Sequence, residues 1–559
     1  MGASGVVCRA PPHSSGEPQH RTFPLLNLHR ARVRRNHGRP RSNGFIERAR
    51  NTLPDFTAQS QRASDKALTL IRHVNSFRVC CDKVTMVSEA KYRGSEPRDV
   101  TWRQTDSGYQ EKRMRKTPIL GLLGLFLALH GGDAQTNSSA APPSRIALRA
   151  ARLMDGKRDT IITNAVILIE HQKIIAVGTG LTIPVGTTVI DLGDQTLLPG
   201  LIDTHTHLLL EMDGENLRYK DDGMLRVVAT ESTAERVLLG AKLGREDLEA
   251  GITTVRDLGN SGVNGDVALR DAIFRGWVRG PTVVPSTRAL AAPGGQFMRL
   301  IPEAQKIIEQ EYVTINGPES ARQAVRQALY DGAWCIKVIV NGSPADVTLD
   351  ELKAIVDQAH TSKVKVAAHA VDDHATRIAA QAGVDSIEHA FEIQDDVLKL
   401  MAQKHIFLVP TDSTEEGYFA MENGNRPMST EERARAMEKY KTLVARNGDR
   451  LRRAIAAGVP IAAGSDVWQL WPGKTRGQAS LVMLEAYAAE GMKPADIIRS
   501  VTSSAAELIG AQFEVGTIEK GKYADIIAVP GDPLNDATAL EHAKFVMRGG
   551  EIIRNQTQK

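Results

Sequence analysis

Apolar runs of two kinds follow one another along this chain, and the pattern changes near Thr196. From Arg145 to Thr196 the runs are short and end at Gly or Asn turn residues, which is typical of β-strands. Beyond Thr196, apolar runs alternate with helical stretches; the clearest helical stretches are Glu319 to Asp331, Leu349 to Lys363 and Thr430 to Ala457. Short strand-like runs return after Leu508. The pattern predicts two small β units separated by a long strand–helix segment.

The strand–helix segment contains eight apolar runs with helical stretches between most of them. The runs end at His207, Asp257, Arg288, Val340, His369, His389, Thr411 and Asp466. Eight strands alternating with helices over about 300 residues predict an α/β protein with a (β/α)8 TIM barrel. The β units at its two ends resemble each other in alternation and turns. We therefore expect them to form one small composite β-sandwich domain that the barrel interrupts.

These changes in pattern divide the chain into five predicted parts. The first two are an N-terminal extension and a signal peptide, and the rest are the two halves of the β-sandwich with the barrel between them. The predicted boundaries are 1–113, 114–134, 135–196, 197–510 and 511–559.

Positive charge is concentrated in the N-terminal extension. Residues 1–113 contain 21 Lys and Arg against 10 Asp and Glu, so the other 446 residues have a net charge of −7 within a total of +4. The extension has no sustained apolar periodicity, which predicts disorder or an over-extended reading frame. The pI of 8.7 is therefore no argument for a nucleic-acid surface, and we expect no nucleic-acid partner.

A signal-peptide pattern begins at Met114. Basic residues follow it, then the apolar run Ile119 to Leu129 and the small residues of Gly132-Asp133-Ala134, which is the layout that a signal peptidase recognises. Met114 then competes with Met1 as the start of translation. The run is too short to span a membrane, so we expect an exported protein, periplasmic or secreted, without stable membrane insertion. Its mature part contains a single cysteine, Cys335, and so no internal disulfide.

Residues that can bind metal ions recur where the predicted barrel strands end. Barrel enzymes place their chemistry at the C-terminal ends of the strands, and alternate residues of a strand share a face. Taken singly, each of these residues also has an ordinary structural interpretation, such as a core histidine or a helix N-cap. Together they form one candidate site, composed of His205, His207, Lys337, His369, His389 and Asp466.

The motifs around these residues resemble those of the amidohydrolase superfamily. They are Pro-Gly-Leu-Ile-Asp-Thr-His-Thr-His (199–207), Gly-Ile-Thr-Thr-Val-Arg-Asp (251–257), Ile-Lys-Val (336–338), Ala-Ala-His-Ala (367–370), Ser-Ile-Glu-His (386–389) and Ala-Gly-Ser-Asp (463–466), with a closing β segment at 515–526. The resemblance extends from about residue 145 to 556. It is greatest to the imidazolonepropionase-related group, which includes Xaa-Pro and Xaa-Arg/Lys dipeptidases and ochratoxin-hydrolysing amidases.

The resemblance implies a centre with two divalent metal ions, and imidazole and carboxylate ligands suit Zn²⁺. It implies that His205, His207 and Asp466 bind one ion and that His369 and His389 bind the other. Lys337, carboxylated by CO2 to a carbamate, would bridge both. Asp466 would also be the catalytic group, transferring a proton while a metal-activated hydroxide attacks an amide.

The implied function is an exported, metal-dependent amidohydrolase that cleaves dipeptides or N-acyl amino acids, as prolidases and carboxypeptidases do. A cyclic-amide hydrolase of the imidazolonepropionase or hydantoinase type is the alternative, and a non-catalytic barrel scaffold is a more remote one. The expected partner is a small-molecule or dipeptide substrate. A homo-oligomer is also compatible with the resemblance, because relatives are often oligomeric.

Candidate substrate contacts are fewer. Dipeptidase-like relatives carry Gly-Gly-His after the third strand, where this chain has Gly294-Gly295-Gln296. Gln296 can form hydrogen bonds but does not titrate near neutral pH. Arg288 and Tyr312 are candidates for binding a substrate carboxylate. Arg256 is expected either to face the site or to pair with Asp257.

Overall fold

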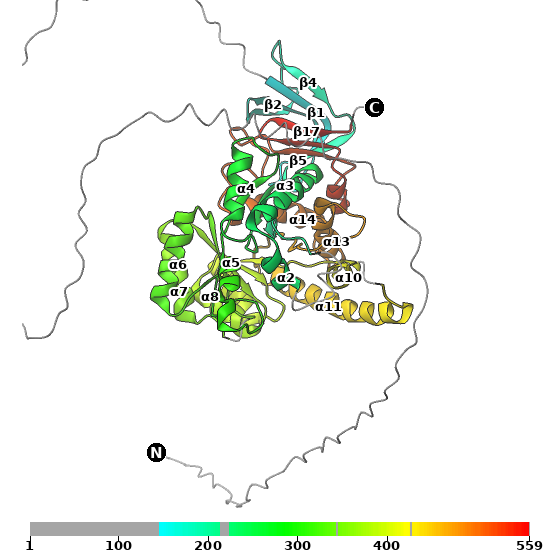
Figure 1. The fold of residues 1–559 in the computed structure, drawn as a ribbon. Coiled ribbons are helices and arrows are strands. Elements are labelled where there is room, and N and C mark those ends of the chain that lie inside the picture. The colour runs from blue at the N-terminus through cyan, green and yellow to red at the C-terminus, as the bar shows by residue number, and fades with distance from the viewer. Residues whose placement is uncertain (1–144, 213–222, 343–344, 425–426, 558–559) are drawn as a thin grey trace, which may run out of the picture. The chain divides into compact units, whose positions relative to one another are not determined.

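The computed structural model describes residues 145–212, 223–342, 345–424 and 427–557 (Figure 1). The predicted N-terminal extension, 1–113, and the predicted signal peptide, 114–134, lie outside these residues. Within them, no helix combines the length and the apolar character needed to cross a membrane.

Strands from both ends of the described chain share one eight-stranded sheet. Its order is β17-β16-β15-β5-β1-β2-β3, and β4 pairs with β1. The strands are β1 (Arg145–Leu153), β2 (Ile162–Glu170), β3 (Lys173–Thr179), β4 (Thr188–Asp191), β5 (Gln195–Pro199), β15 (Ile526–Pro530), β16 (Phe545–Arg548) and β17 (Glu551–Asn555). The join is the antiparallel pair β5–β15, in which Leu198 lies opposite Ile527. Figure 1 shows the N-terminal β1, β2 and β5 beside the C-terminal β17.

The strands that follow β5 are parallel and form two sheets. One has the order β6-β7-β8 and the other β10-β9-β11-β12-β13-β14. Their bounds are β6 (Leu201–Thr206), β7 (Ile252–Asp257), β8 (Thr282–Pro285), β9 (Ala289–Ala291), β10 (Tyr312–Thr314), β11 (Cys335–Ile339), β12 (Lys365–Ala370), β13 (Ser386–His389) and β14 (Phe407–Val409). The fold is thus α/β, as predicted. Among the described residues, these strands form two separate sheets and are not hydrogen-bonded into one closed barrel.

The eighth predicted strand, 460–466, is not a regular strand. It is connected to β14 by an isolated bridge between Leu408 and Ile461, and to β6 by the hydrogen bond from the Thr204 amide to the Ala463 carbonyl, 2.9 Å long. This segment therefore lies between the two parallel sheets and contacts both. Its irregular backbone brings Asp466 to the end of β6, where the Asp466 amide donates to the His205 carbonyl at 2.7 Å.

The third predicted strand, 282–288, is also interrupted. Thr287 adopts a φ of 60°, a left-handed conformation that a β-branched residue seldom adopts within a strand. Strand β8 consequently ends at Pro285 and β9 starts at Ala289. The sequence analysis missed β9 and β10, because three-residue strands leave no alternation to detect.

Helices follow most of the parallel strands, and their ends show the expected capping chemistry. Capping boxes begin α3 at Ser232, α7 at Thr348 and α11 at Ser429, each satisfying otherwise unpaired amides of the first turn. The helices are α2 (Gly223–Thr230), α3 (Thr233–Ala250), α4 (Gly265–Phe274), α5 (Gln305–Glu311), α6 (Pro318–Asp331), α7 (Leu349–Thr361), α8 (Asp373–Ala382), α9 (Asp395–Lys404), α10 (Glu415–Asn423), α11 (Thr430–Ala456), α12 (Arg476–Ser480), α13 (Val482–Ala489), α14 (Pro494–Ser500) and α15 (Ser503–Leu508), with 3-10 turns at Pro302–Ala304 and Ala537–His542.

Candidate active site

The six predicted metal-type residues all line one cavity. They come from the ends of β6, β11, β12 and β13 and from the irregular segment 460–466. The cavity has a volume of about 390 Å³, and His205, His207, Lys337, His369, His389 and Asp466 all contribute to its wall. Residues separated by up to 261 positions in sequence therefore meet at the same end of the parallel strands, where such folds place their chemistry.

The side chains in this cluster lie within ligand distance of one another. Nε2 of His207 is 3.1 Å from Oδ1 of Asp466, and Nε2 of His205 is 3.5 Å from the same oxygen. One ligand atom each from His205, His389 and Asp466 fall within 4.8 Å of one another. The Lys337 Nζ is 3.4 Å from His205 Nε2, and the rings of His369 and His389 are 4.6 Å apart.

Hydrogen bonds behind the imidazoles determine which nitrogen faces the cavity. His205 Nδ1 lies 2.8 Å from Oε2 of Glu388, and His207 Nδ1 lies 3.0 Å from the Gly259 carbonyl. Carboxylate and carbonyl oxygens only accept, so both Nδ1 atoms are protonated donors. The lone pair of each Nε2 then faces Asp466, which is the arrangement found in metal-binding histidines.

His389 is held in a similar way. Its Nδ1 is 2.8 Å from Oγ1 of Thr411, whose hydroxyl donates to the Pro410 carbonyl at 2.7 Å. Since that hydroxyl proton is used, Thr411 accepts from His389, and the other ring nitrogen keeps its lone pair. His205, His207 and His389 therefore each keep one ring nitrogen with a free lone pair.

Burial tunes the protonation of the cluster toward metal binding. It lowers the pKa of His205 and of His389 well below the usual range, and that of His369 to about 3, because a charged imidazole is poorly solvated there. Burial likewise lowers the pKa of Lys337 to about 8. For Asp466, burial alone would raise the pKa, but its neighbours His205, His207 and Lys337 outweigh that effect and lower it. Neutral imidazoles and an ionised carboxylate are thus the stable forms near neutral pH.

Unusual backbone conformations are concentrated here. His389, Ala390, Thr411 and Asp466 have φ values of 71°, 49°, 56° and 51°, in the left-handed region that L residues seldom occupy. Such conformations persist only where the surrounding structure enforces them, and they are typical of functional sites.

Asp203 and Ser465, which had no predicted role, join β6 to segment 460–466. The buried Asp203 carboxylate accepts from the His205 amide at 3.0 Å, and from the Ser465 amide and hydroxyl at 3.0 and 2.6 Å. Burial raises the pKa of Asp203 to about 6. Gly464 permits the close approach of the two segments, since a Cβ there would lie 2.6 Å from that of His205. The role of Asp203 could have been suspected from the sequence, because it is a charged residue inside the apolar run before His205.

A buried ion pair lies behind His205. Arg256 donates to Oε1 of Glu388 at 2.9 Å and to the Ser386 hydroxyl at 3.1 Å, while Oε2 of Glu388 accepts from His205. Arg256 therefore pairs with Glu388 and not with Asp257, which accepts instead from the Leu208 amide. Glu388 lies next to His389 in the Ser-Ile-Glu-His motif, but its partner across the fold was not visible in sequence.

Of the three candidate substrate contacts, two line the cavity and one does not. Gln296 and Tyr312 line the cavity; the Tyr312 hydroxyl donates to Gln296 Oε1 at 3.3 Å, and Gln296 Nε2 is 3.4 Å from His369 Nε2. Arg288 is not among the cavity's described lining residues, and its guanidinium donates to the Glu309 carbonyl at 2.8 Å. The first two thus lie beside the cluster and the third is engaged elsewhere.

Apolar side chains provide much of the remaining wall. This part of the lining consists of Leu210, Met212, Met224, Leu258, Ala289, Ile339, Phe391 and Trp468. A wall of this composition favours a ligand with an apolar group, since burying such a group removes apolar surface from water.

The cluster of imidazoles, lysine and carboxylate at the ends of the parallel strands is a candidate metal site of an enzyme, and sequence comparison identifies the family. The model of the amidohydrolase family matches residues 196–554, so the chain belongs to this family. It is accordingly a hydrolase acting on carbon–nitrogen bonds. The recognition made from the strand-end motifs is confirmed.

Several characterised relatives are similar over most of their length. An ochratoxinase from Aspergillus niger is 29% identical over 70% of this chain and 83% of its own. An imidazolonepropionase from Fusobacterium nucleatum is 26% identical over 71% and 92%. The crystal structure of a Xaa-Pro dipeptidase with bound methionine superposes with a TM-score of 0.61 at 28% identity, covering 73% of this chain and 99% of that one.

Proposed function

We propose that this protein is an exported, metal-dependent amidohydrolase that cleaves the amide bond of dipeptides or N-acyl amino acids. The observation that carries the proposal is that ligand atoms of His205, His389 and Asp466 lie within 4.8 Å of one another in one cavity, with His207 Nε2 3.1 Å from the Asp466 carboxylate. Family membership and similarity to a Xaa-Pro dipeptidase and an ochratoxinase support the choice of substrate.

The donor set fits two divalent cations, most simply Zn²⁺. His205, His207 and Asp466 would hold one ion, and His369 and His389 the other, with Lys337 between them as a carbamate. The lowered pKa of Lys337 supports this assignment, because only a neutral amine reacts with CO2. Once carboxylated, Lys337 no longer supplies positive charge, and the cluster then consists of acceptors that require cations. The bound ions would polarise the substrate carbonyl and lower the pKa of water.

Asp466 is the group that we assign to proton transfer. Its carboxylate is ionised and lies at the end of β6 beside His205 and His207, so a free oxygen can accept a proton from the attacking water. The same oxygen can return the proton to the leaving amine. The enforced left-handed backbone at Asp466 holds the carboxylate in the cavity throughout.

The cavity wall supports a substrate with one apolar portion. Phe391 and Trp468 supply aromatic surface, while Gln296 offers both a donor and an acceptor beside His369. An apolar side chain or acyl group would lie against Phe391 and Trp468, and the polar amide would lie toward Gln296. We infer a preference for dipeptides or N-acyl amino acids with an apolar or aromatic residue.

The experiment is a hydrolysis screen of dipeptides and N-acyl amino acids by the zinc-reconstituted protein, with a chelator-treated sample as control. Chelator-sensitive release from apolar members is expected. Zinc-loaded protein that releases nothing from any member would contradict the dipeptidase and acylase assignment.

Cyclic-amide hydrolysis is the second candidate, favoured by the similarity to imidazolonepropionase over 92% of that protein. Hydantoin and imidazolone rings belong in the same screen, and turnover of these alone would support it. A non-catalytic scaffold is not favoured, because all six ligand positions are filled and the family is one of hydrolases.

Export is part of the proposal and rests on the signal-peptide pattern at residues 114–134. Expression of the full chain followed by N-terminal sequencing of the extracytoplasmic protein tests it. A mature N-terminus near Gln135 is expected, whereas retention of an uncleaved chain inside the cell would contradict it.

A further inference from the structure

A buried arginine joins the two segments that carry His207 and Asp466. Arg476, the first residue of α12, is 4% exposed. Its Nη2 donates to Thr206 Oγ1 at 2.8 Å, to the His207 carbonyl at 3.1 Å and to the Val467 carbonyl. One guanidinium nitrogen thereby contacts both the residue at the end of β6 and the residue that follows Asp466.

These contacts determine the distance between two of the proposed metal ligands. One accepting carbonyl belongs to His207, and the other belongs to Val467, the residue directly after Asp466. The side chains of His207 and Asp466 are themselves 3.1 Å apart. Because both carbonyls accept from the same Nη2 atom, they cannot separate without losing hydrogen bonds in a buried place. Other hydrogen bonds join segment 460–466 to β6 before the ligands, through Asp203 and Ser465; Arg476 is bonded to the backbone directly after them, at His207 and Val467.

We propose that Arg476 is a positioning residue that holds His207 and Asp466 at the separation required by a metal ion. The inference rests on the metal centre of the proposed function. Arg476 is not among the described residues that line the catalytic cavity, so it acts through the backbone of the ligands and does not touch substrate.

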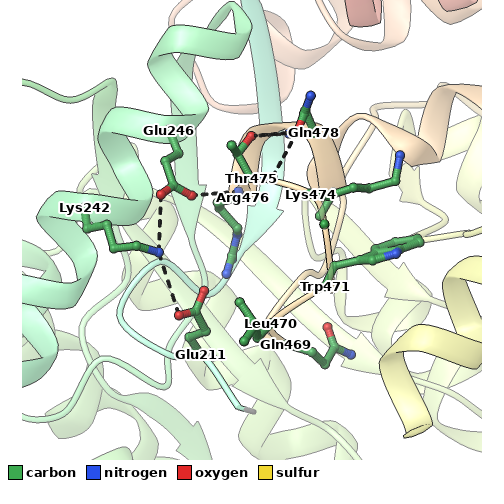
Figure 2. A pocket seen from close by; sticks show the side chains of 12 residues that line it. Glu211, Lys242, Glu246, Gln469, Leu470, Trp471, Lys474, Thr475, Arg476 and Gln478 are labelled. Carbon is green, nitrogen blue, oxygen red and sulfur yellow. Dashed lines mark hydrogen bonds and ion pairs between the residues drawn. The ribbon is translucent and has the colours of Figure 1, made fainter. Parts of the chain in front are cut away.

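The other side of Arg476 faces a second cavity. This cavity has a volume of about 300 Å³ and is lined by Arg476, Glu211, Lys242, Glu246 and Lys474 among others. Figure 2 shows Lys242 between the two carboxylates, with Nζ 3.3 Å from Glu246 and 3.9 Å from Glu211, while Glu246 accepts from the Arg476 amide at 2.8 Å. Removal of the Arg476 side chain would extend this cavity toward the His207 carbonyl.

That geometry allows a chemical-rescue experiment. A free guanidinium ion has the size and charge of the deleted group, and the acceptors on Thr206, His207 and Val467 remain for it to bind. We expect Arg476→Ala to bind Co²⁺ roughly 10- to 100-fold more weakly, the usual effect of losing a residue that orients metal ligands. Millimolar guanidinium, far below denaturing concentrations, is expected to restore most of that affinity, as measured by competition with a chromogenic chelator and by the cobalt absorption spectrum.

Two matched variants make the test specific. Arg450 is an equally buried arginine that donates to the carbonyl of His389 and to Asp412, but it lines neither cavity among the described residues. Arg450→Ala should therefore weaken metal binding without rescue. Lys474 also lines the second cavity, with its Nζ 5.6 Å from the centre of the Trp471 ring, and it makes no described contact with the proposed metal ligands, so Lys474→Ala should bind Co²⁺ as the parent does.

The outcomes separate this inference from the proposed function. Parent-like affinity in Arg476→Ala, a loss that guanidinium leaves unchanged, or equal rescue of Arg450→Ala would each overturn it. If Arg476→Ala does not fold, Arg476→Lys decides, because the lysine side chain ends short of the position of Nη2 and keeps only the charge. Full Co²⁺ affinity in that variant would again overturn the inference. Absence of metal binding by the parent protein would refute the proposed function itself, and with it this role.

Discussion

At the residue scale, Asp466 combines an enforced backbone, a lowered pKa and contact with two imidazoles. Asp466→Asn keeps an oxygen that can bind a metal but removes the proton acceptor. We expect the zinc content to stay near that of the parent while kcat falls by roughly 10²- to 10⁴-fold, the usual contribution of a general acid–base group. Metal analysis and steady-state kinetics on the same preparation measure both quantities.

The matched control for this substitution is Asp357→Asn, because Asp357 is an exposed aspartate on α7. Both its zinc content and its kcat should equal those of the parent. Full turnover by Asp466→Asn would show that another group transfers the proton.

Lys337 gives the site a dependence on pH and CO2. Burial lowers its pKa to about 8, so the neutral amine that reacts with CO2 increases as the pH rises through that value. At a fixed concentration of dissolved CO2, zinc uptake by metal-free protein should increase from about one pH unit below this pKa to about one unit above it. Added CO2 should accelerate the uptake.

The control for this prediction is Lys337→Gln, which has a side chain of similar length and no amine. We expect this variant to take up little zinc and to show no response to CO2. Zinc uptake by the parent that is independent of CO2 would argue against the carbamate.

At the scale of elements, segment 460–466 lies against β6 because position 464 has no side chain. A Cβ at that position would lie 2.6 Å from His205 Cβ and 2.6 Å from Val409 Cγ1, and neither neighbour can move freely. Gly464→Ala should therefore lower the free energy of unfolding by about 1–3 kcal/mol, as overpacking does, and weaken zinc binding. Chemical denaturation and metal titration measure the two effects.

Gly178 on β3 provides the comparison for Gly464. A Cβ at Gly178 would meet only Leu181, at an ordinary 3.4 Å, so Gly178→Ala should leave zinc binding intact. If Gly464→Ala binds zinc as the parent does, the close approach is not what places Asp466.

The sequence analysis predicted the elements whose signals are local. The Ser386–His389 strand was placed with its observed bounds, and the ends of β6, β11 and β12 were placed within one residue, because a polar residue stands at the end of each predicted run or directly after it. The contacts from Arg256 to Glu388 and from Asp203 to Ser465 could not be predicted. Each joins positions more than 100 residues apart, and a single sequence contains no information on such pairing. For the same reason 460–466 was assigned as a strand: its composition favours one, and only its neighbours prevent it.

At the scale of the whole described unit, β15 connects the C-terminal strands to the strands that lead into the site. Ile527 on β15 is fully buried, lies opposite Leu198 of β5, and packs against Gly251 at the start of β7. Ile527→Ala should lower the free energy of unfolding by about 2–5 kcal/mol, the usual cost of such a cavity. Loss of hydrolase activity and loss of hydrogen-exchange protection of the β2 and β15 amides should share one lowered denaturation midpoint, because the sheet and the site unfold together.

Ile552 on β17 is 37% exposed and provides the control, since Ile552→Ala should shift that midpoint little. Two separate transitions in Ile527→Ala would show that the mixed sheet and the parallel strands unfold independently.

The pairing of β5 with β15 also has a consequence for synthesis. Pro199 leaves the ribosome 327 residues before its partner Ile526, which at typical elongation rates is a delay of about 15 to 65 s. During that interval β5 has an unpaired edge, and an unpaired edge can pair with another nascent chain. A nonsense mutation near the 3′ end of the gene would make this state permanent, so it would produce an aggregating polypeptide rather than a slightly shortened enzyme.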